Sequence, residues 1–354
     1  MANENFIVSS LPAYVQNNRE VLLKNFALVG TETRRRIGLQ TGIKKDAYLN
    51  FLNVAPTLQS GASCGFSAAG DVALTQRTIS TAAIKVDLEI CPENLLGKWA
   101  EYLVRVNATE HELPFEQYVV DGLVAEINKK IEKLIWQGDH TQSSDANIKW
   151  IDGFLYIANA ESDVIDVSIA SGTSAYDGIV SVYAAMTEES LERGGVIFVS
   201  PAIFRAFMQE MVVRNYFHYN PADATPNEVI LPGSDVRVVK TPGLAGSLKV
   251  LGTFAENLVY GCDMEGDAED IDIWFSQDNR NFRMQAKWNS GVQIAFPNHV
   301  VLGAFAAAPS VPTDYQASIA ANTAAIATNT DRTADVLEDV HDATNKAITT
   351  KAAV

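Results

Sequence analysis

The sequence predicts an α+β fold whose main elements are one long helix, one buried β-α unit and a late group of strands. The long helix is indicated by apolar residues that recur every three or four positions over residues 114–137. The buried unit is indicated by the continuous apolar run Val196–Val199, followed by Ser200-Pro201, a typical helix start. Short strand patterns separated by turns fill residues 229–305, and such late clustering of strands is typical of the α+β class.

Composition and charge restrict the class of protein. The chain has 354 residues, 47% of them hydrophobic, which is enough for one large core or two moderate ones. The net charge of −16 repels phosphate, so we do not expect the folded body to bind nucleic acid generally. Three separated cysteines without a CxxC pair indicate neither a zinc site nor a disulfide framework. With no secretion signal and no membrane span expected, we predict a soluble protein of the cytoplasm.

Residues 1–50 form a basic N-terminal arm on this acidic chain. The arm holds seven Lys and Arg residues against four acidic ones, and an amphipathic helix is expected over Leu11–Leu28. Its predicted contact residues are Arg34, Arg35, Arg36, Lys44 and Lys45. We expect these side chains to dock on the acidic body of another copy, and direct contact with nucleic acid is the alternative.

Residues 51–95 are expected to form an extended loop with a long antiparallel hairpin. Between Leu74 and Ile90, apolar residues alternate with charged ones, as in Ile84-Lys85-Val86-Asp87. A period of two with one polar face is typical of an antiparallel strand. The Cys91-Pro92 pair then ends the strand.

The long helix is the most regular element of the chain. Val119, Leu123, Ile127 and Ile131 form one apolar stripe, which should face a core. Pro114 suits the first turn and Gly138 the C-terminal end. At about 1.5 Å per residue such a helix is roughly 36 Å long, the length of a scaffold across a domain.

The helices and strands after residue 170 are predicted from caps and apolar patterns in the same way. Ser174 should cap a helix before the buried strand at Val196–Val199, and a second helix should follow Pro201. The late strands are expected at Val236–Lys240, Lys249–Gly252, Asn257–Tyr260, Ile271–Phe275, Phe282–Trp288 and Val292–Phe296.

Residues 309–354 are expected to form a C-terminal coiled-coil tail. Heptad spacing gives a seam with apolar and Asn positions at Ile319, Asn322, Ile326, Asn329, Val336 and Val340. The repeat Ile-x-x-Asn-Thr occurs at Ile319 and again at Ile326. It resembles the stalks of trimeric phage fibres and adhesins, which implies inward Asn amides from three chains around an anion. A lone helix lying on the body is the alternative.

Three sequence patterns could indicate an enzymatic or metal-binding function. Gly61-Ala-Ser-Cys-Gly65 matches the GxSxG nucleophile elbow, but no buried strand precedes it and no helix pattern follows, so a flexible loop is favoured. The five histidines lie far apart, without metal-ligand spacing. The acidic stretch Asp263–Asp272 could hold calcium, but its order is not that of an EF-hand, and a solvated hairpin loop is favoured. We predict no catalytic residue, no cofactor and no metal site.

In their order, these parts resemble the Hong Kong 97-like major capsid proteins of tailed bacteriophages over about residues 1–305. The segments that carry the resemblance are Ile84–Ile90, Cys91–Leu96, Trp136–Asp139, Asp152–Leu155, Val196–Pro201, Leu251-Gly252 and Asn257-Leu258. The resemblance implies a peripheral domain from residues 96–160 and 246–308, with the spine helix 114–137, and an axial domain from residues 161–245. The coiled-coil tail is an addition to this pattern.

The resemblance also implies a function and partners. The chain would be a structural subunit of an icosahedral phage head that encloses double-stranded DNA without sequence-specific contact. It would assemble in the bacterial host cytoplasm as hexamers and pentamers, with a portal and a separate scaffolding protein, and without a membrane or small-molecule substrate. Encapsulins, compartment shells of the same fold, are the first alternative. A phage fibre or other trimeric structural protein is the second, suggested by the tail alone.

Overall fold

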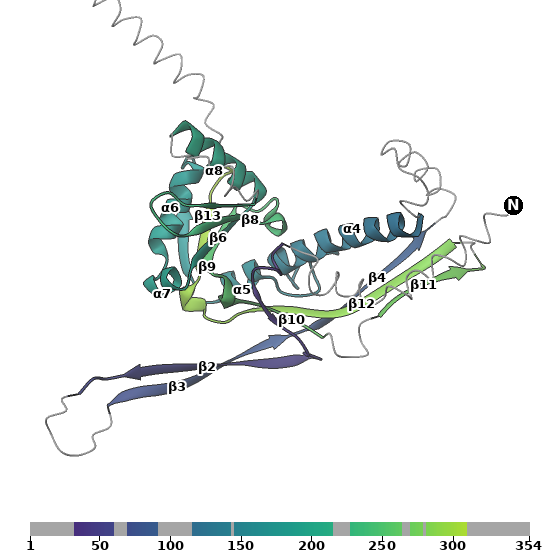
Figure 1. The fold of residues 1–354 in the computed structure, drawn as a ribbon, viewed down its shortest axis with the longest axis horizontal. Coiled ribbons are helices and arrows are strands. Elements are labelled where there is room, and N and C mark those ends of the chain that lie inside the picture. The colour runs from purple at the N-terminus through teal and green to yellow at the C-terminus, as the bar shows by residue number, and fades with distance from the viewer. Residues whose placement is uncertain are drawn as a thin grey trace, which may run out of the picture.

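The computed structural model describes residues 32–59, 69–90, 115–142, 145–214, 227–263, 270–278 and 281–309. Figure 1 shows a rounded part, an elongated part along a long helix, and a two-stranded ribbon that projects away from both. Several expectations lie outside the described residues: the helix over 11–28, the Gly61–Gly65 loop, the Cys91–Leu96 segment, most of the acidic stretch after Asp263, and the tail 310–354.

The rounded part is a six-stranded mixed sheet in the order β5-β13-β9-β6-β8-β7. Its strands are β5 (Ile165–Ile169), β6 (Gly195–Val199), β7 (Glu228–Ile230), β8 (Arg237–Lys240), β9 (Lys249–Phe254) and β13 (Val301–Phe305). Its helices are α6 (Ala175–Ala185), α7 (Glu188–Glu192) and α8 (Pro201–Val213). The predicted caps are confirmed, because Ser174 accepts a hydrogen bond from the Asp177 N–H and Ser200 one from the Ile203 N–H.

Strand β6 is buried on both faces, as its continuous apolar run predicts. Ile197 and Val199 belong to the core cluster formed with α6 and α8. Phe198 points the other way, and its ring lies 5.0 Å from that of Trp136 on the long helix. The sheet therefore joins two cores, one under its own helices and one shared with the elongated part.

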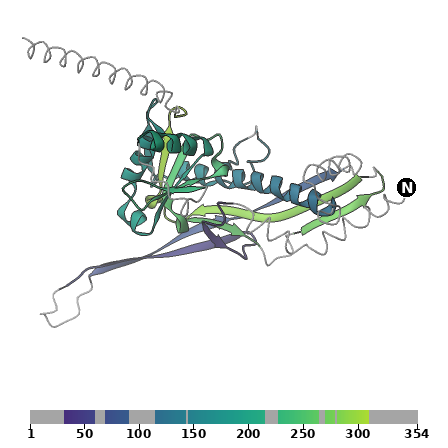
Figure 2. The same cartoon turned by 45° about the horizontal axis from the view of Figure 1, so that its top comes forward.

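The elongated part combines the long helix α4 (Phe115–Gln137) with a five-stranded sheet (Figure 2). Strands β1 (Gly38–Gln40), β10 (Leu258–Cys262), β12 (Asn281–Ile294) and β11 (Asp270–Ser276) follow one another, and β4 (Ala82–Ile90) pairs with β12. The predicted stripe of α4 faces this sheet, since Ile127 and Ile131 are buried in one cluster with Met284 and Trp288. Short helix α5 (Phe154–Ala160) inserts Phe154 beside Trp136.

The expected hairpin within residues 51–95 needs correction. The projecting ribbon pairs β2 (Asp46–Pro56) with β3 (Gly70–Ser80), so it begins before residue 51. The alternating stretch Ile84–Ile90 lies in β4, which pairs antiparallel with β12 in the elongated part. The period-two pattern identified the strand correctly but carried no information about its partner.

The late strands also differ from expectation. β9 and β13 come from residues 246–308, assigned to the peripheral domain, yet they lie in the six-stranded sheet with strands from 161–245. The two strands expected at Phe282–Trp288 and Val292–Phe296 form the single strand β12. β5 and β13, parallel neighbours 136 residues apart at Ile165 and Val301, were not predicted. Their pairing depends on long-range contacts that local periodicity does not encode.

Candidate assembly surface

The projecting ribbon exposes apolar side chains on its outer face. Tyr48 is 59% exposed on β2, and Leu74 and Val72 are 71% and 65% exposed on β3. The register pairs Tyr48 with Thr78 and Asn50 with Gln76, and Leu74 and Val72 continue the same alternation along β3. Tyr48, Leu74 and Val72 therefore share one face of the ribbon. A two-stranded ribbon is marginally stable by itself, and exposed apolar residues on it indicate a surface that another molecule covers.

The opposite face of the ribbon rests on the body near its base. Ile79 is fully buried, and Gly261 of β10 leaves room for it, because a Cβ there would lie 2.7 Å from Ile79 Cδ1. Gln293 of β12 donates a hydrogen bond of 2.7 Å to the Thr78 carbonyl. The ring of Phe51 contacts the ring of Phe296 at 4.5 Å. The base is thus fixed by apolar and polar contacts, and the ribbon beyond Phe51 projects (Figure 1).

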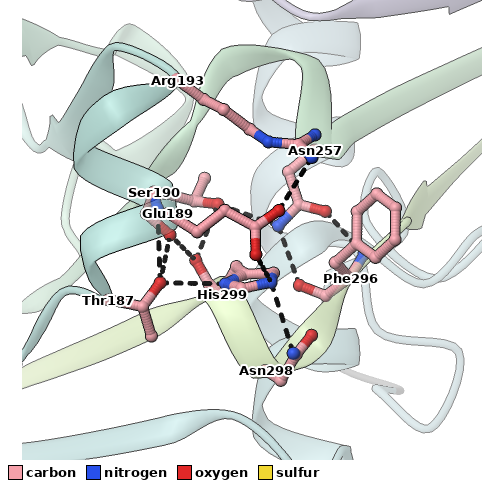
Figure 3. Close-up of polar contacts among 9 residues, drawn as sticks. Thr187, Glu189, Ser190, Arg193, Asn257, Phe296, Asn298 and His299 are labelled. Atoms are coloured by element: carbon pink, nitrogen blue, oxygen red, sulfur yellow. Dashed lines mark hydrogen bonds and ion pairs between the residues drawn. The ribbon is translucent and has the colours of Figure 1, made fainter. Parts of the chain in front are cut away.

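Phe296 belongs to a cluster that ties α7 to the turns before β10 and β13 (Figure 3). Asn257 accepts from the Phe296 N–H at 2.6 Å and donates to the Phe296 carbonyl at 2.9 Å. The Arg193 guanidinium lies 6.0 Å from the Phe296 ring centre and 5.1 Å from that of Phe254, and it pairs with Glu189 at 2.8 Å. These contacts hold Phe296 in one orientation under the ribbon.

His299 connects the same turn to the start of α7. Its Nδ1 lies 2.9 Å from Thr187 Oγ1, and its Nε2 lies 3.2 Å from Glu189 Oε2. Its backbone carbonyl accepts from the Ser190 hydroxyl at 3.2 Å and from the Thr253 hydroxyl at 3.1 Å.

A hydroxyl, an imidazole and a carboxylate meet here, but their geometry is structural. A nucleophilic serine would donate to the imidazole. Ser190 instead donates to the His299 backbone carbonyl. Thr187 Oγ1 does contact the imidazole, but it also accepts the Ser190 N–H as the cap of α7. The hydroxyl groups therefore serve the helix start and the turn, and the cluster positions the ribbon base.

The basic residues of the arm divide into two groups by their burial, and the buried position of Arg34 does not fit the expectation that it contacts another copy. Arg34 is 3% exposed; it donates to Asn128 of α4 at 3.1 Å and lies over the Tyr260 ring. Arg36 forms ion pairs with Glu32 and Glu228 of its own chain. Burial requires a partner for each charge, and the chain itself supplies these partners. Arg35, Lys44 and Lys45 are exposed.

The described end of the arm also packs on its own chain. Thr33 is buried, donates to Glu132 of α4 and accepts from the Trp136 indole N–H at 2.7 Å. Ile37 and Ile43 are buried as well. Residues 32–43 are thus part of the body.

Within the described ranges, no helix combines the length and apolar composition that crossing a membrane requires. Within the same ranges, no group of three or more His, Cys, Asp or Glu side chains is placed to hold a metal ion.

Sequence reasoning did not identify the residues that make this surface. Phe51 and Phe296 are single aromatic residues far apart in the sequence, and only long-range packing brings their rings together. A usable signal was present in β3, where Val72 and Leu74 alternate with Ala73 and Thr75. That alternation predicts a one-sided strand but does not show that its apolar side stays uncovered.

Comparison with known proteins identifies the fold. No family model matches the chain, and no curated protein matches its sequence. The fold is similar to that of a chain in the satellite phage P4 procapsid, solved including its size determination (Sid) protein. The match spans 82% of this chain and 90% of the procapsid chain, at 12% identity and a TM-score of 0.54. A match to a chain from Gordonia phage Cozz spans 78% of this chain and 87% of the Cozz chain, at 12% identity and a TM-score of 0.50. The prediction of an α+β fold resembling the Hong Kong 97-like phage capsid proteins is confirmed at this level.

Proposed function

We propose that this chain is a phage major capsid protein, a structural subunit that self-assembles into an icosahedral shell around double-stranded DNA. The observation that carries the proposal is the projecting β2–β3 ribbon with its exposed apolar face, on a chain with this fold. A surface of this kind on an isolated subunit needs a partner, and a second copy of the chain is available at every contact of a shell.

The proposed contact between copies is extended and consists of many individually weak side-chain contacts. Tyr48, Val72 and Leu74 each offer an exposed apolar side chain to a neighbour. Area removed from water contributes about 25 cal/mol per Å², so each ribbon would contribute a few kcal/mol at most. Repetition of weak contacts over a closed shell then makes the assembly stable. We propose that Arg35, Lys44 and Lys45 add electrostatic contacts to the acidic body of a neighbour.

The two parts of the body would have different places in the shell. The six-stranded sheet with α6 and α8 would form the axial domain and meet its copies around the centre of each hexamer or pentamer. The five-stranded sheet with α4 would form the peripheral domain. This assignment follows the two sheets, and it differs from the boundaries expected from the sequence in placing β9 and β13 in the axial domain.

The finer features of the proposal concern partners and the tail. We propose assembly in the host cytoplasm with a portal and a separate scaffolding protein, and DNA held without sequence-specific contact. Residues 309–354 would form a trimeric coiled coil with Ile319, Asn322, Ile326 and Asn329 in its seam. An encapsulin-like compartment shell is the second candidate, favoured by the same projecting ribbon, and nucleic acid content of the particles separates the two.

The experiment is electron microscopy of the full-length protein expressed in bacteria. The expected result is closed shells, together with loss of shells from soluble Tyr48→Ser/Val72→Ser/Leu74→Ser protein. Gln76→Ser is the matched control, because Gln76 lies exposed on the same strand between Leu74 and Thr78 but adds no apolar area. Monomers from the unchanged chain under all assembly conditions, or normal shells from the triple variant, would contradict the proposal.

A further inference from the structure

One ion pair crosses from the projecting ribbon to the body. Arg77 of β3 donates through Nη2 to Glu161 Oε1, and the two residues are 84 positions apart in the chain. Their side chains are 22% and 32% exposed, so the pair is partly removed from water. Arg77 faces the body together with Ile79, while Thr78 between them faces outward.

Arg77, Thr78 and Ile79 each contact a different element of the body. Arg77 reaches Glu161, the C-cap residue of α5, just before the chain enters β5 of the six-stranded sheet. The Thr78 carbonyl accepts from Gln293 of β12, and Ile79 packs on Gly261 of β10. Together with the contact of Phe51 on β2 with Phe296, these three contacts on three elements set the direction of the ribbon.

The contacts of Arg77 leave part of its guanidinium unused. Its Nε is buried and has no hydrogen-bond partner within the part of the chain that the structure describes. A guanidinium can use five donors in a planar fork, and a pair built for stability would use more of them. A partly exposed ion pair typically contributes about 0–1 kcal/mol, so stability does not account for this contact.

We infer that the Arg77–Glu161 pair positions the ribbon and thereby selects the curvature of the shell, an inference that rests on the proposed function. From Arg77 to the end of β3 at Gly70 the strand spans about 24 Å, at about 3.4 Å per residue. A tilt of about 10° at the base would move that end by about 4 Å, more than a packed contact between copies tolerates. A weak contact at the base therefore has a large geometric effect at the far end.

The first arm of the test uses the unassembled full-length subunit. Hydrogen exchange over Thr75–Ser80 is measured for the unchanged chain, Arg77→Gln, Glu161→Gln and the reciprocal Arg77→Glu/Glu161→Arg. We expect at least fivefold faster exchange in both single variants, with a melting temperature within about 2 °C, and recovery in the reciprocal variant. Lys85→Gln is the control, because Lys85 and Asp87 form an ion pair on β4 whose side chains are 67% and 52% exposed.

The second arm measures particle diameters by electron microscopy. We expect one narrow size class from the unchanged chain, Lys85→Gln and the reciprocal variant, and mixed sizes or open sheets from both single variants. Uniform shells with unchanged exchange in Arg77→Gln would overturn the inference, as would a reciprocal variant that behaves like the single ones. Absence of shells from the unchanged chain would refute the proposed function instead, and the exchange arm would still decide whether the pair positions the ribbon.

Discussion

The ring of Phe51 lies 4.5 Å from the ring of Phe296 at an interplanar angle of 53°, which joins the projecting ribbon to the cluster of α7. Phe296 in turn is held by two hydrogen bonds to Asn257 and by the Arg193 guanidinium. The apolar contact at Phe51 and the ion pair at Arg77 thus act on opposite strands of the ribbon. Both strands of the ribbon are therefore held on the body, through the same face.

Removal of the Phe51 ring should loosen β2 at its base. An aromatic pair contributes about 0.5–1.5 kcal/mol beyond the area it buries, so we expect Phe51→Ala to leave the body folded. Exchange of the β2 amides over residues 47–51 should become faster, while the β6 amides stay protected. Phe51→Leu is the control, since it retains apolar volume, and equal protection of β2 in the Ala variant would contradict the contact.

Loss of one buried side chain from α4 should destabilise the elongated part. Ile131 is 3% exposed and packs in the cluster shared with β12. A change from Ile to Ala in such a core typically costs about 2–5 kcal/mol, and Ile127→Asp should yield insoluble protein. Guanidinium unfolding of Ile131→Ala measures the effect, with exposed Lys129→Ala as the control. A free energy of unfolding unchanged within 0.5 kcal/mol, roughly the scatter of neutral surface changes, would contradict the assignment.

The sequence predicted the elements whose signal is local. The stripe of α4, the Ser174 and Ser200 caps and the buried run Val196–Val199 all depend on neighbours within a few residues, and each was found where expected. Pairing partners depend on residues far along the chain. For this reason the partner of β4 was predicted incorrectly, and the pairing of β5 with β13 was not predicted.

The site was predicted less well than the fold, and Arg34 illustrates the cause. A cluster of three arginines indicates an exposed basic surface when charge is counted along the chain. In the structure Arg34 is buried against Asn128 and Tyr260, because residues 32–43 pack on α4 and β10. Charge counting does not include burial, which is set by tertiary contacts.

This division of the basic residues gives a prediction. Arg34→Glu would place an acidic group in a buried site, which costs about 3–5 kcal/mol when the charge is uncompensated, so we expect misfolded protein. Lys44→Glu/Lys45→Glu changes exposed residues, so we expect a folded subunit that assembles poorly, most clearly at low salt. Circular dichroism shows whether each variant is folded, and light scattering shows whether it assembles. Normal assembly of the double Lys variant would show that these residues make no contact between copies.

Acid should weaken the contact between α6 and α8. Hydrogen bonding from Arg214, at 2.8 Å, lowers the pKa of Asp177 below its usual 3.8. A carboxyl group with a lowered pKa stabilises the fold above its unfolded value and loses that effect as the pH falls through its folded value. We therefore expect Asp177→Asn to melt below the unchanged protein at pH 7, with a difference that shrinks as the pH falls below about 4. A melting difference independent of pH would refute this role.

The tail gives the last prediction, which follows from its heptads alone. Isoleucine at one seam position with asparagine at the next occurs twice, at Ile319-Asn322 and Ile326-Asn329. A buried polar residue in a seam lowers stability but fixes register and the number of strands. Three subunits meet at each threefold of an icosahedral shell, which suits a trimer, and a short helix needs such packing to form in water.

The measurement is sedimentation equilibrium of residues 310–354 fused to a small monomeric carrier. We expect a trimer whose formation depends on concentration. Asn322→Ile/Asn329→Ile should raise its melting temperature but mix its oligomeric states, because Ile at both seam positions no longer restricts the strand number. Asn345→Ile, outside the seam, is the control and should leave the trimer unchanged. A monomer at all concentrations would support the lone helix, and a dimer would show that the Asn layers specify two strands.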